Sequence, residues 1–241
     1  MITQAQYKAQ SKFALLLLGA PKTRKTTLAL SFPSPGIIDA DLNLAGPLRH
    51  YPSKDIHIST IDVDDTGAVV PRAKRWLRLV SELNVLATTP EVKTLIIDTI
   101  GKVHTYLVDY LIDQNTSDGK RVSGEPVMTT QLWYPYGVLL ERLVNHCRAS
   151  GKLVVVTSHL RESKDEQLGF IQYGPTVSGQ TGDRFGGFFT DVWCCDYKAG
   201  KYIVNTKPSA RMSLGRSLDL PDEFEFNWDV VQAKLNEVDN I

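Results

Sequence analysis

The sequence predicts an α/β fold, with a mostly parallel central sheet flanked by helices and a C-terminal β-hairpin extension. Three observations carry this prediction. Short apolar runs alternate with segments whose apolar residues recur at helical spacing, which favours parallel strands joined by crossover helices. Polar residues gather where those runs end, at the sheet edge where such folds bind ligands. Near the C-terminus, two apolar segments are separated only by residues 198–200, a spacing typical of a hairpin.

The composition is that of a globular protein of 241 residues, with 42% hydrophobic and 22% charged residues. Lys+Arg and Asp+Glu both number 27, so the overall charge does not indicate a nucleic-acid partner. Cys147, Cys194 and Cys195 lack the spacing of a metal site or a disulfide framework, which favours reduced thiols in the cytoplasm. The polar N-terminus is unlike a signal peptide, and the apolar run after it is too short to cross a membrane.

The first expected strand, residues 13–18, leads into GAPKTRKTT and then into an apolar segment that can begin a helix. A phosphate-binding loop has the pattern G-x-x-x-x-G-K-[ST] between a strand and a helix. Lys25 would bind the outer phosphates and the Thr26 hydroxyl would bind Mg²⁺, at a helix N-terminus that favours anions. The alternative is a lysine-rich turn without a ligand. The candidate nucleotide-binding residues are Gly19, Ala20, Pro21, Lys22, Thr23, Arg24, Lys25, Thr26 and Thr27.

Arg24 departs from this pattern, because it stands where the motif has its second glycine. Glycine at that position allows a positive φ and close approach of the backbone to the phosphates. The departure puts normal turnover in doubt more than nucleotide binding, so we expect an ATPase whose turnover is weak. We expect the Arg24 side chain to point outward, in which case Arg24→Gly would leave the affinity for ATP nearly unchanged.

Breaker residues and periodicity place the remaining elements. Two prolines and a glycine in residues 32–36 end the first helix soon after Thr26. The expected strands are 36–41, 55–63, 93–98, 152–160, 191–197 and 201–207, with a short strand near 170–173. The expected helices are 71–87, 100–112 and 131–149, and polar loops are expected at 42–53, 113–128 and through most of 161–188. The predicted organisation is a polar lead-in at 1–11, one domain at 12–220 and a tail at 221–241 that holds one short helix.

Acidic residues at the ends of two expected strands are candidates for metal and water chemistry. Asp98 ends an apolar strand, as the acid that joins a Mg²⁺ shell in P-loop enzymes does, so Thr26 and Asp98 are the expected metal ligands. The alternative is a cap for the next helix, a role that Thr99 would equally fill. Asp41, two residues beyond Asp39, is the candidate that orients or deprotonates the attacking water. Its alternative role is to cap a loop.

Three further polar residues are candidates for contact with the phosphates. His159 ends the strand at 152–160 and would sense the γ-phosphate, unless it only caps the strand. Lys207 and Arg211 follow the hairpin and would be phosphate-binding cations, acting within the chain or on a neighbour's nucleotide. The alternative is that both are ordinary solvated charges.

The order of GAPKTRKTTLAL, IIDADLNLAGP, LIIDT and LVVVTSHL resembles the RecA recombinase core, over roughly residues 12–220. KTTLALSFPSPGIIDAD is more closely similar to phage-encoded RecA-like ATPases of single-strand annealing recombination. The resemblance implies a RecA-like P-loop ATPase that uses ATP and Mg²⁺, assembles into a ring or filament, and acts with a single-strand binding protein. It places Asp41 at the catalytic acid, a glutamate in RecA, and His159 at RecA's glutamine that links nucleotide state to the DNA loops. Lys207 lies near the RecA lysines that reach across the subunit interface.

Binding to single-stranded DNA rests mainly on this resemblance, which matches the segments 113–128 and 161–188 to the DNA-binding loops. The aromatic rings among the candidates would stack on bases, unless these are flexible surface loops whose aromatics pack inward. Two other functions stay open: a nucleotide-dependent loading factor that binds proteins and no DNA, and a P-loop domain with a purely structural role. No motif that reads the base is visible, so the choice between ATP and GTP is open too. The DNA-binding candidates are Lys120, Arg121, Arg161, Lys164, Arg184, Phe185 and Phe188.

Overall fold

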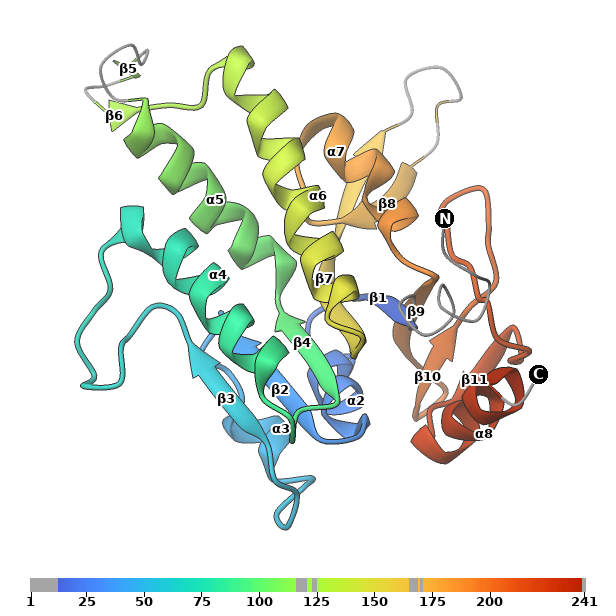
Figure 1. The fold of residues 1–241 in the computed structure, drawn as a ribbon. Helices are drawn as coiled ribbons and strands as arrows, with labels where there is room; N and C mark the ends of the chain where they lie inside the picture. The colour runs from blue at the N-terminus through green and yellow to red at the C-terminus, as the bar shows by residue number, and fades with distance from the viewer. Residues whose placement is uncertain (1–12, 116–120, 123–124, 165–168, 170, 240–241) are drawn as a thin grey trace, which may run out of the picture.

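The computed structural model describes residues 13–115, 121, 122, 125–164, 169 and 171–239. Within this part of the chain, one nine-stranded sheet lies between helices (Figure 1). The strands are β1 (Ala14–Gly19), β2 (Pro35–Asp39), β3 (His57–Thr60), β4 (Thr94–Asp98), β7 (Leu153–Lys164), β8 (Ile171–Pro175), β9 (Asp191–Lys198), β10 (Lys201–Asn205) and β11 (Glu223–Glu225). A separate two-stranded ladder joins β5 (Arg121–Val122) to β6 (Glu125–Pro126). The helices are α2 (Lys25–Ser31), α3 (Ala45–Leu48), α4 (Arg72–Thr88), α5 (Ile100–Gln114), η1 (Thr130–Leu132), α6 (Trp133–Ala149), α7 (Gly179–Arg184), η2 (Phe185–Phe188) and α8 (Trp228–Asp239).

The centre of the sheet is parallel, in the order β9-β1-β7-β4-β2-β3. The antiparallel strands β10 and β11 extend it beyond β9, which confirms the predicted α/β class and the hairpin at residues 198–200. The register aligns the carboxyl ends of the parallel strands. Gly19 pairs with His159 and with Cys195 on its two sides, and Asp39 pairs with Asp98. The polar strand ends therefore meet at one edge of the sheet.

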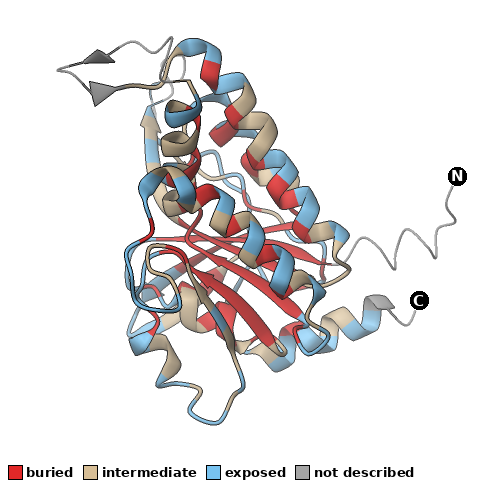
Figure 2. Ribbon diagram, turned by 60° about the vertical axis from the view of Figure 1, so that its left-hand side comes forward, coloured by how far each residue is buried: buried red, intermediate tan, exposed pale blue. Residues whose placement is uncertain are grey.

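Alternation along the strands divides the core between the two faces of the sheet. On β1, Leu16 belongs to one buried cluster, whereas Leu15 and Leu17 belong to the other. The first cluster packs the sheet against α4, α5 and α6, and the second packs it against α2 and α8. Figure 2 shows the buried strands enclosed between helices whose outer faces are exposed. In the described residues, no helix is both long and apolar enough to cross a membrane.

The structure differs from the sequence-based predictions in several places, and residues 113–128, expected as a polar loop, contain the ladder of β5 and β6. Residues 42–53 contain the short helix α3, and residues 161–188 are mostly regular rather than a polar loop, because β7 continues to Lys164 and pairs with β8. Neither helix α7 nor η2 was expected. The tail after residue 221 holds the expected helix, α8, but also β11, which pairs with β10. These elements are short, and β8 and β11 exist through strand partners that a local pattern does not reveal.

Candidate nucleotide-binding site

The loop between β1 and α2 has the backbone of a phosphate-binding loop. Gly19 admits no side chain, because a Cβ atom there would lie 2.6 Å from the Cys195 carbonyl oxygen and 2.7 Å from Thr23 Oγ1. Lys22 and Arg24 both adopt left-handed backbone conformations, with φ of 67° and 63°. Arg24 is also the N-cap residue of α2. The arginine thus takes the left-handed conformation for which the motif ordinarily uses glycine.

Lys25 is buried at the centre of this loop, with only 5% of its surface exposed. Its Nζ donates hydrogen bonds to the carbonyl oxygens of Gly19, at 2.9 Å, and Ala20, at 2.8 Å. Thr23 Oγ1 donates to the same Ala20 oxygen at 2.8 Å, which ties the loop to itself. Burial lowers the pKa of the Lys25 ammonium. A desolvated cation that is hydrogen-bonded to neutral carbonyls at a helix N-terminus favours an incoming anion.

Thr26 and Asp98 lie together across the sheet edge. Thr26 Oγ1 donates to Asp98 Oδ2 at 2.9 Å, and the buried Thr157 hydroxyl donates to Asp98 Oδ1. Asp98 is 4% exposed, and burial raises the pKa of its carboxyl group while the two threonine hydrogen bonds oppose the rise. Thr99 is the N-cap residue of α5 and makes no side-chain cap. Asp98 is therefore turned toward the phosphate loop, and a hydroxyl beside a carboxylate is a donor pair that suits Mg²⁺.

Asp39 is the last residue of β2 and Asp41 lies two residues beyond it, and the two carboxyl groups have different surroundings. Asp41 is exposed, and its Oδ2 accepts a hydrogen bond of 3.1 Å from Thr99 Oγ1. Asp39 is buried, accepts a hydrogen bond of 3.3 Å from the Asn43 backbone N–H, and has its pKa raised by burial. Asp39 therefore supports the loop, whereas Asp41 has carboxylate surface open to a water molecule.

His159 stands beside the phosphate loop at the register position opposite Gly19. Its Nδ1 is buried and has no hydrogen-bond partner among the described residues. Burial, and then the nearby Lys25 ammonium, lower the pKa of the imidazole, so the ring is neutral near pH 7. A neutral ring with an unused nitrogen is able to accept or donate a hydrogen bond when a ligand arrives.

One cavity of about 470 Å³, which we call the phosphate cavity, brings these groups together. The sequence predicted five of its principal residues, since they lie in the loop or at strand ends. It missed Asn43, Gly46, Pro47 and His50, which follow Asp41 in the chain, although their position after that acid was a usable signal. The principal residues that line the cavity are Lys25, Thr26, Asp41, Asp98, Thr99 and His159.

A second cavity of about 560 Å³, which we call the hairpin cavity, adjoins the first between α2 and the β9–β10 hairpin. Arg24, Thr27 and His50 line both cavities. The Arg24 guanidinium carbon lies 4.0 Å from the centre of the Tyr202 ring, so the side chain points outward from the loop as expected. No local pattern in the sequence predicted this cavity. Its apolar and aromatic lining consists of Leu28, Tyr51, Tyr202, Ile203, Val204 and Phe226.

The predicted cations after the hairpin do not line either cavity. Lys207 Nζ pairs with Asp222 Oδ2 at 3.0 Å on the surface, where the lysine side chain is 67% exposed. Arg211 is also exposed. Neither side chain therefore lines this chain's own site, and a role on a neighbour's nucleotide stays a prediction.

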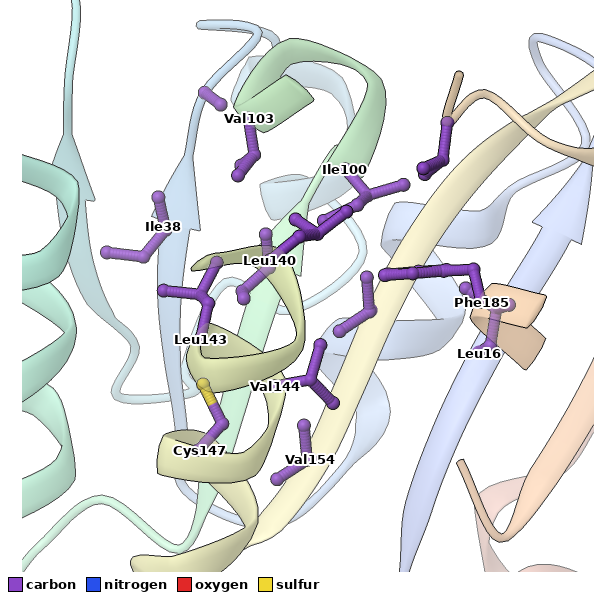
Figure 3. Close-up of a cluster of buried hydrophobic side chains, with 14 of the residues drawn as sticks. Leu16, Ile38, Ile100, Val103, Leu140, Leu143, Val144, Cys147, Val154 and Phe185 are labelled. Carbon is purple, nitrogen blue, oxygen red and sulfur yellow. The ribbon is translucent and has the colours of Figure 1, made fainter. Parts of the chain in front are cut away.

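The structure corrects the DNA-binding assignment of Phe185, whereas that of Phe188 stays a prediction. Phe185 is 0% exposed and packs against Phe188 and Phe189, at ring-centroid distances of 5.7 and 5.3 Å. Figure 3 shows Phe185 among the core side chains, together with Leu16 and Val144. Phe188 is half-buried and packs on the same core. The Phe185 ring is thus unavailable to a base, because η2 turns it into the core.

The cationic candidates have different surroundings. Arg161 lies 3.8 Å from the exposed Asp183, and Lys164 and Arg184 are exposed. Arg121 belongs to β5, and Lys120 lies outside the described residues. Three cationic candidates therefore lie on or beside the ribbon formed by β7 and β8.

A family model described as an AAA domain matches residues 11–213 of the chain. No curated protein matches the chain. Among solved structures, a KaiC-like protein from the hyperthermophilic archaeon Pyrococcus horikoshii OT3 aligns with a TM-score of 0.43 at 14% identity, covering 85% of this chain and 82% of that chain.

Proposed function

Because the chain belongs to the AAA-domain family, we propose that it is a RecA-like P-loop ATPase that uses ATP and Mg²⁺ to control binding to single-stranded DNA. The observation that carries the proposal is the hydrogen bond between Thr26 and Asp98 beside the buried Lys25 ammonium. A phosphate-binding lysine, a metal-binding hydroxyl and a strand-end carboxylate are the three groups that a P-loop site requires.

The chain's own residues supply binding and charge stabilisation. The loop N–H groups and Lys25 would bind the phosphate oxygens, and Lys25 would stabilise the charge that develops on the transferred group. Thr26 and Asp98 would hold Mg²⁺, which neutralises phosphate charge when bound. Since Asp98 is buried between two threonine hydroxyls, its position is fixed before any ligand arrives.

Asp41 is the residue we assign to the attacking water. Thr99 fixes one of its carboxylate oxygens, which leaves the other able to accept a proton from water. The water oxygen then forms a bond to the γ-phosphorus in line with the leaving group, the bond from that phosphorus to the bridging oxygen breaks, and ADP keeps the electron pair. The proton passes to Asp41 and then to solvent.

Strand β7 connects this site to the DNA-binding candidates. His159 lies at the phosphate cavity, and Arg161 and Lys164 follow it on the same strand. The His159 carbonyl oxygen accepts a hydrogen bond of 2.9 Å from Thr176 Oγ1, which ties the strand to the segment after β8. We propose that His159 reports phosphate occupancy along β7 to this ribbon.

The proposal includes a single-strand binding protein as partner. DNA binding by this surface itself is tested by titrating a labelled oligothymidine with and without a non-hydrolysable ATP analogue, across salt concentrations. Lys164→Ala should weaken binding and reduce the salt slope by about 1, as loss of one phosphate contact does. Lys93→Ala is the matched control, since Lys93 is exposed at the opposite edge of the sheet. If the wild type shows no salt-dependent binding, the DNA role is wrong and the protein-binding loading factor replaces it.

Assembly into a ring or filament is the second part of this proposal, because Lys207 and Arg211 would then meet a neighbour's nucleotide. Light scattering with ATP and DNA present should give a mass several times that of the chain. A monomer under those conditions would exclude the role of these cations on a neighbouring subunit.

A further inference from the structure

Arg24 occupies a position that costs conformational energy and yet makes a specific contact. Its φ of 63° and ψ of 25° lie in the left-handed region, which residues other than glycine rarely adopt. Its guanidinium stands over the Tyr202 ring at 4.0 Å, within the range of a cation–π interaction. No ion pair of Arg24 occurs among the described residues.

Tyr202 is held on the hairpin independently of Arg24. It pairs across the β9–β10 ladder with Tyr197, and the two ring centroids lie 4.7 Å apart. The aromatic pair is therefore a support against which the guanidinium rests. A nucleobase that stacked directly on the Arg24-covered face of Tyr202 would have to displace the guanidinium, whereas a base that stacked on the guanidinium would not.

The two cavities adjoin each other, and they share the lining residues Arg24, Thr27 and His50. A nucleotide whose phosphates lie in the phosphate cavity would extend past these residues into the hairpin cavity. The volume of about 560 Å³ is typical of small-molecule sites, and the lining combines aromatic and apolar side chains with charged ones such as Lys201 and Glu225.

We propose that Arg24 is the platform on which the base of the bound nucleotide stacks, held flat by Tyr202 at the mouth of the hairpin cavity. The inference rests on the proposed nucleotide site and adds a residue to it. Guanidinium groups are planar and weakly hydrated, and nucleobases stack on them readily. The outward position of Arg24 then has a consequence opposite to the sequence expectation: Arg24→Gly would weaken ATP binding.

The test compares MgATP with Mg-tripolyphosphate, which lacks base and sugar, by calorimetry on the wild type, Arg24→Gly and Arg24→Lys. Glycine keeps the left-handed backbone, and lysine keeps the charge but loses the planar group. Both variants should bind ATP about tenfold more weakly, the scale of one lost stacking contact, while their affinity for tripolyphosphate stays nearly unchanged. The preference for ATP over UTP, whose base is smaller, should shrink in both. Arg49→Ala is the matched control, since Arg49 is exposed nearby but lines neither cavity.

Three results would overturn the proposal. Unchanged or tighter ATP binding by Arg24→Gly would mean that the side chain is idle or blocks the cavity. An equal loss of ATP and tripolyphosphate would make Arg24 a phosphate ligand. ATP binding by Arg24→Lys as tight as that of the wild type would mean that the positive charge of Arg24, and not the planar guanidinium group, contributes to binding. If the wild type binds neither ligand, the proposed nucleotide site itself fails, and that result is distinct from the other three.

Discussion

The hydroxyl of Thr26 donates a hydrogen bond of 2.9 Å to the carboxylate of Asp98, and this bond joins the phosphate loop to the end of β4. The two residues are 72 positions apart in the chain. They meet because β1 and β4 lie in one parallel sheet with only β7 between them. The metal-binding pair of the proposed site is thus built by strand order and is present without a ligand.

Asp98→Asn should weaken Mg²⁺-dependent ATP binding without lowering the stability of the fold. Burial raises the pKa of Asp98, so the carboxylate is less favourable in the folded than in the unfolded chain. The wild type therefore loses stability as pH rises from about 4 through the raised pKa of Asp98, and the variant should lose less, since the buried Asp39 and Asp191 still contribute in this way. We expect Asp98→Asn to melt at the wild-type temperature or higher at pH 8, while its Mg²⁺-dependent affinity for ATP falls about tenfold or more. Thermal melts and calorimetry check both, and a variant that melts lower but still binds would contradict the assignment.

Asp41→Asn should slow hydrolysis without removing the nucleotide. Asp41 is exposed in the phosphate cavity and is held by Thr99, so its loss removes a group that acts on water rather than on phosphate. We expect the steady-state turnover of ATP to fall about 10²-fold, the lower end for general acid–base catalysis, with ATP affinity nearly unchanged. Asp55→Asn, at an exposed aspartate outside the cavity, is the control. Turnover equal to the wild type would leave Asp41 as a loop cap.

The sequence alone was sufficient to predict which residues form the site at the strand ends. Lys25 and Thr26 belong to the loop motif that follows the first strand, and Asp41, Asp98 and His159 lie at or just beyond the ends of apolar runs that form strands. Parallel strands bring their carboxyl ends to one edge. The hairpin cavity was not predictable in the same way. Tyr51 and Tyr202 line it from distant parts of the chain, and they meet because β9 pairs with β1 on the side opposite β7. No local sequence pattern predicts that strand order.

Phe185 shows a different limit of sequence reasoning. A phenylalanine within a polar, glycine-rich segment is equally consistent with an exposed ring and with an anchor that packs inward. Its burial depends on α7 and η2, which place the ring in the same buried cluster as Val192. The inward-packing alternative is the one that the structure bears out.

Phe185→Ala should therefore destabilise the fold. Removing a fully buried aromatic ring from a packed core costs about 3–5 kcal/mol in the free energy of unfolding. Denaturant unfolding measures this cost, and Arg184→Ala at the exposed neighbouring position should stay within about 0.5 kcal/mol of the wild type. A Phe185→Ala protein of wild-type stability that has lost DNA binding would restore the base-stacking role.

His104→Gln should reduce the loss of folding stability that the wild type shows in mild acid. His104 Nδ1 lies 2.7 Å from the Tyr136 hydroxyl, and its Nε2 lies 3.4 Å from Ser178 Oγ. Burial, and then the nearby Arg161, lower the pKa of His104. As pH falls below about 6.5, the unfolded chain takes up a proton that the folded chain resists, so the wild type loses stability. Urea unfolding at pH 7 and pH 5 should show a smaller difference for His104→Gln. His146→Gln, at an exposed position on α6, is the control, and an equal difference in all three proteins would contradict this account.

The most direct test of the nucleotide site is a calorimetric titration of ATP with Mg²⁺ into the wild type and Lys25→Ala. Lys25 is buried and donates hydrogen bonds to two carbonyl oxygens, so a thermal melt first verifies that Lys25→Ala is folded. We predict saturable binding by the wild type, weakened when Mg²⁺ is withheld, and no measurable binding by a folded Lys25→Ala. Equal binding by both proteins, or none by the wild type, would contradict the central claim.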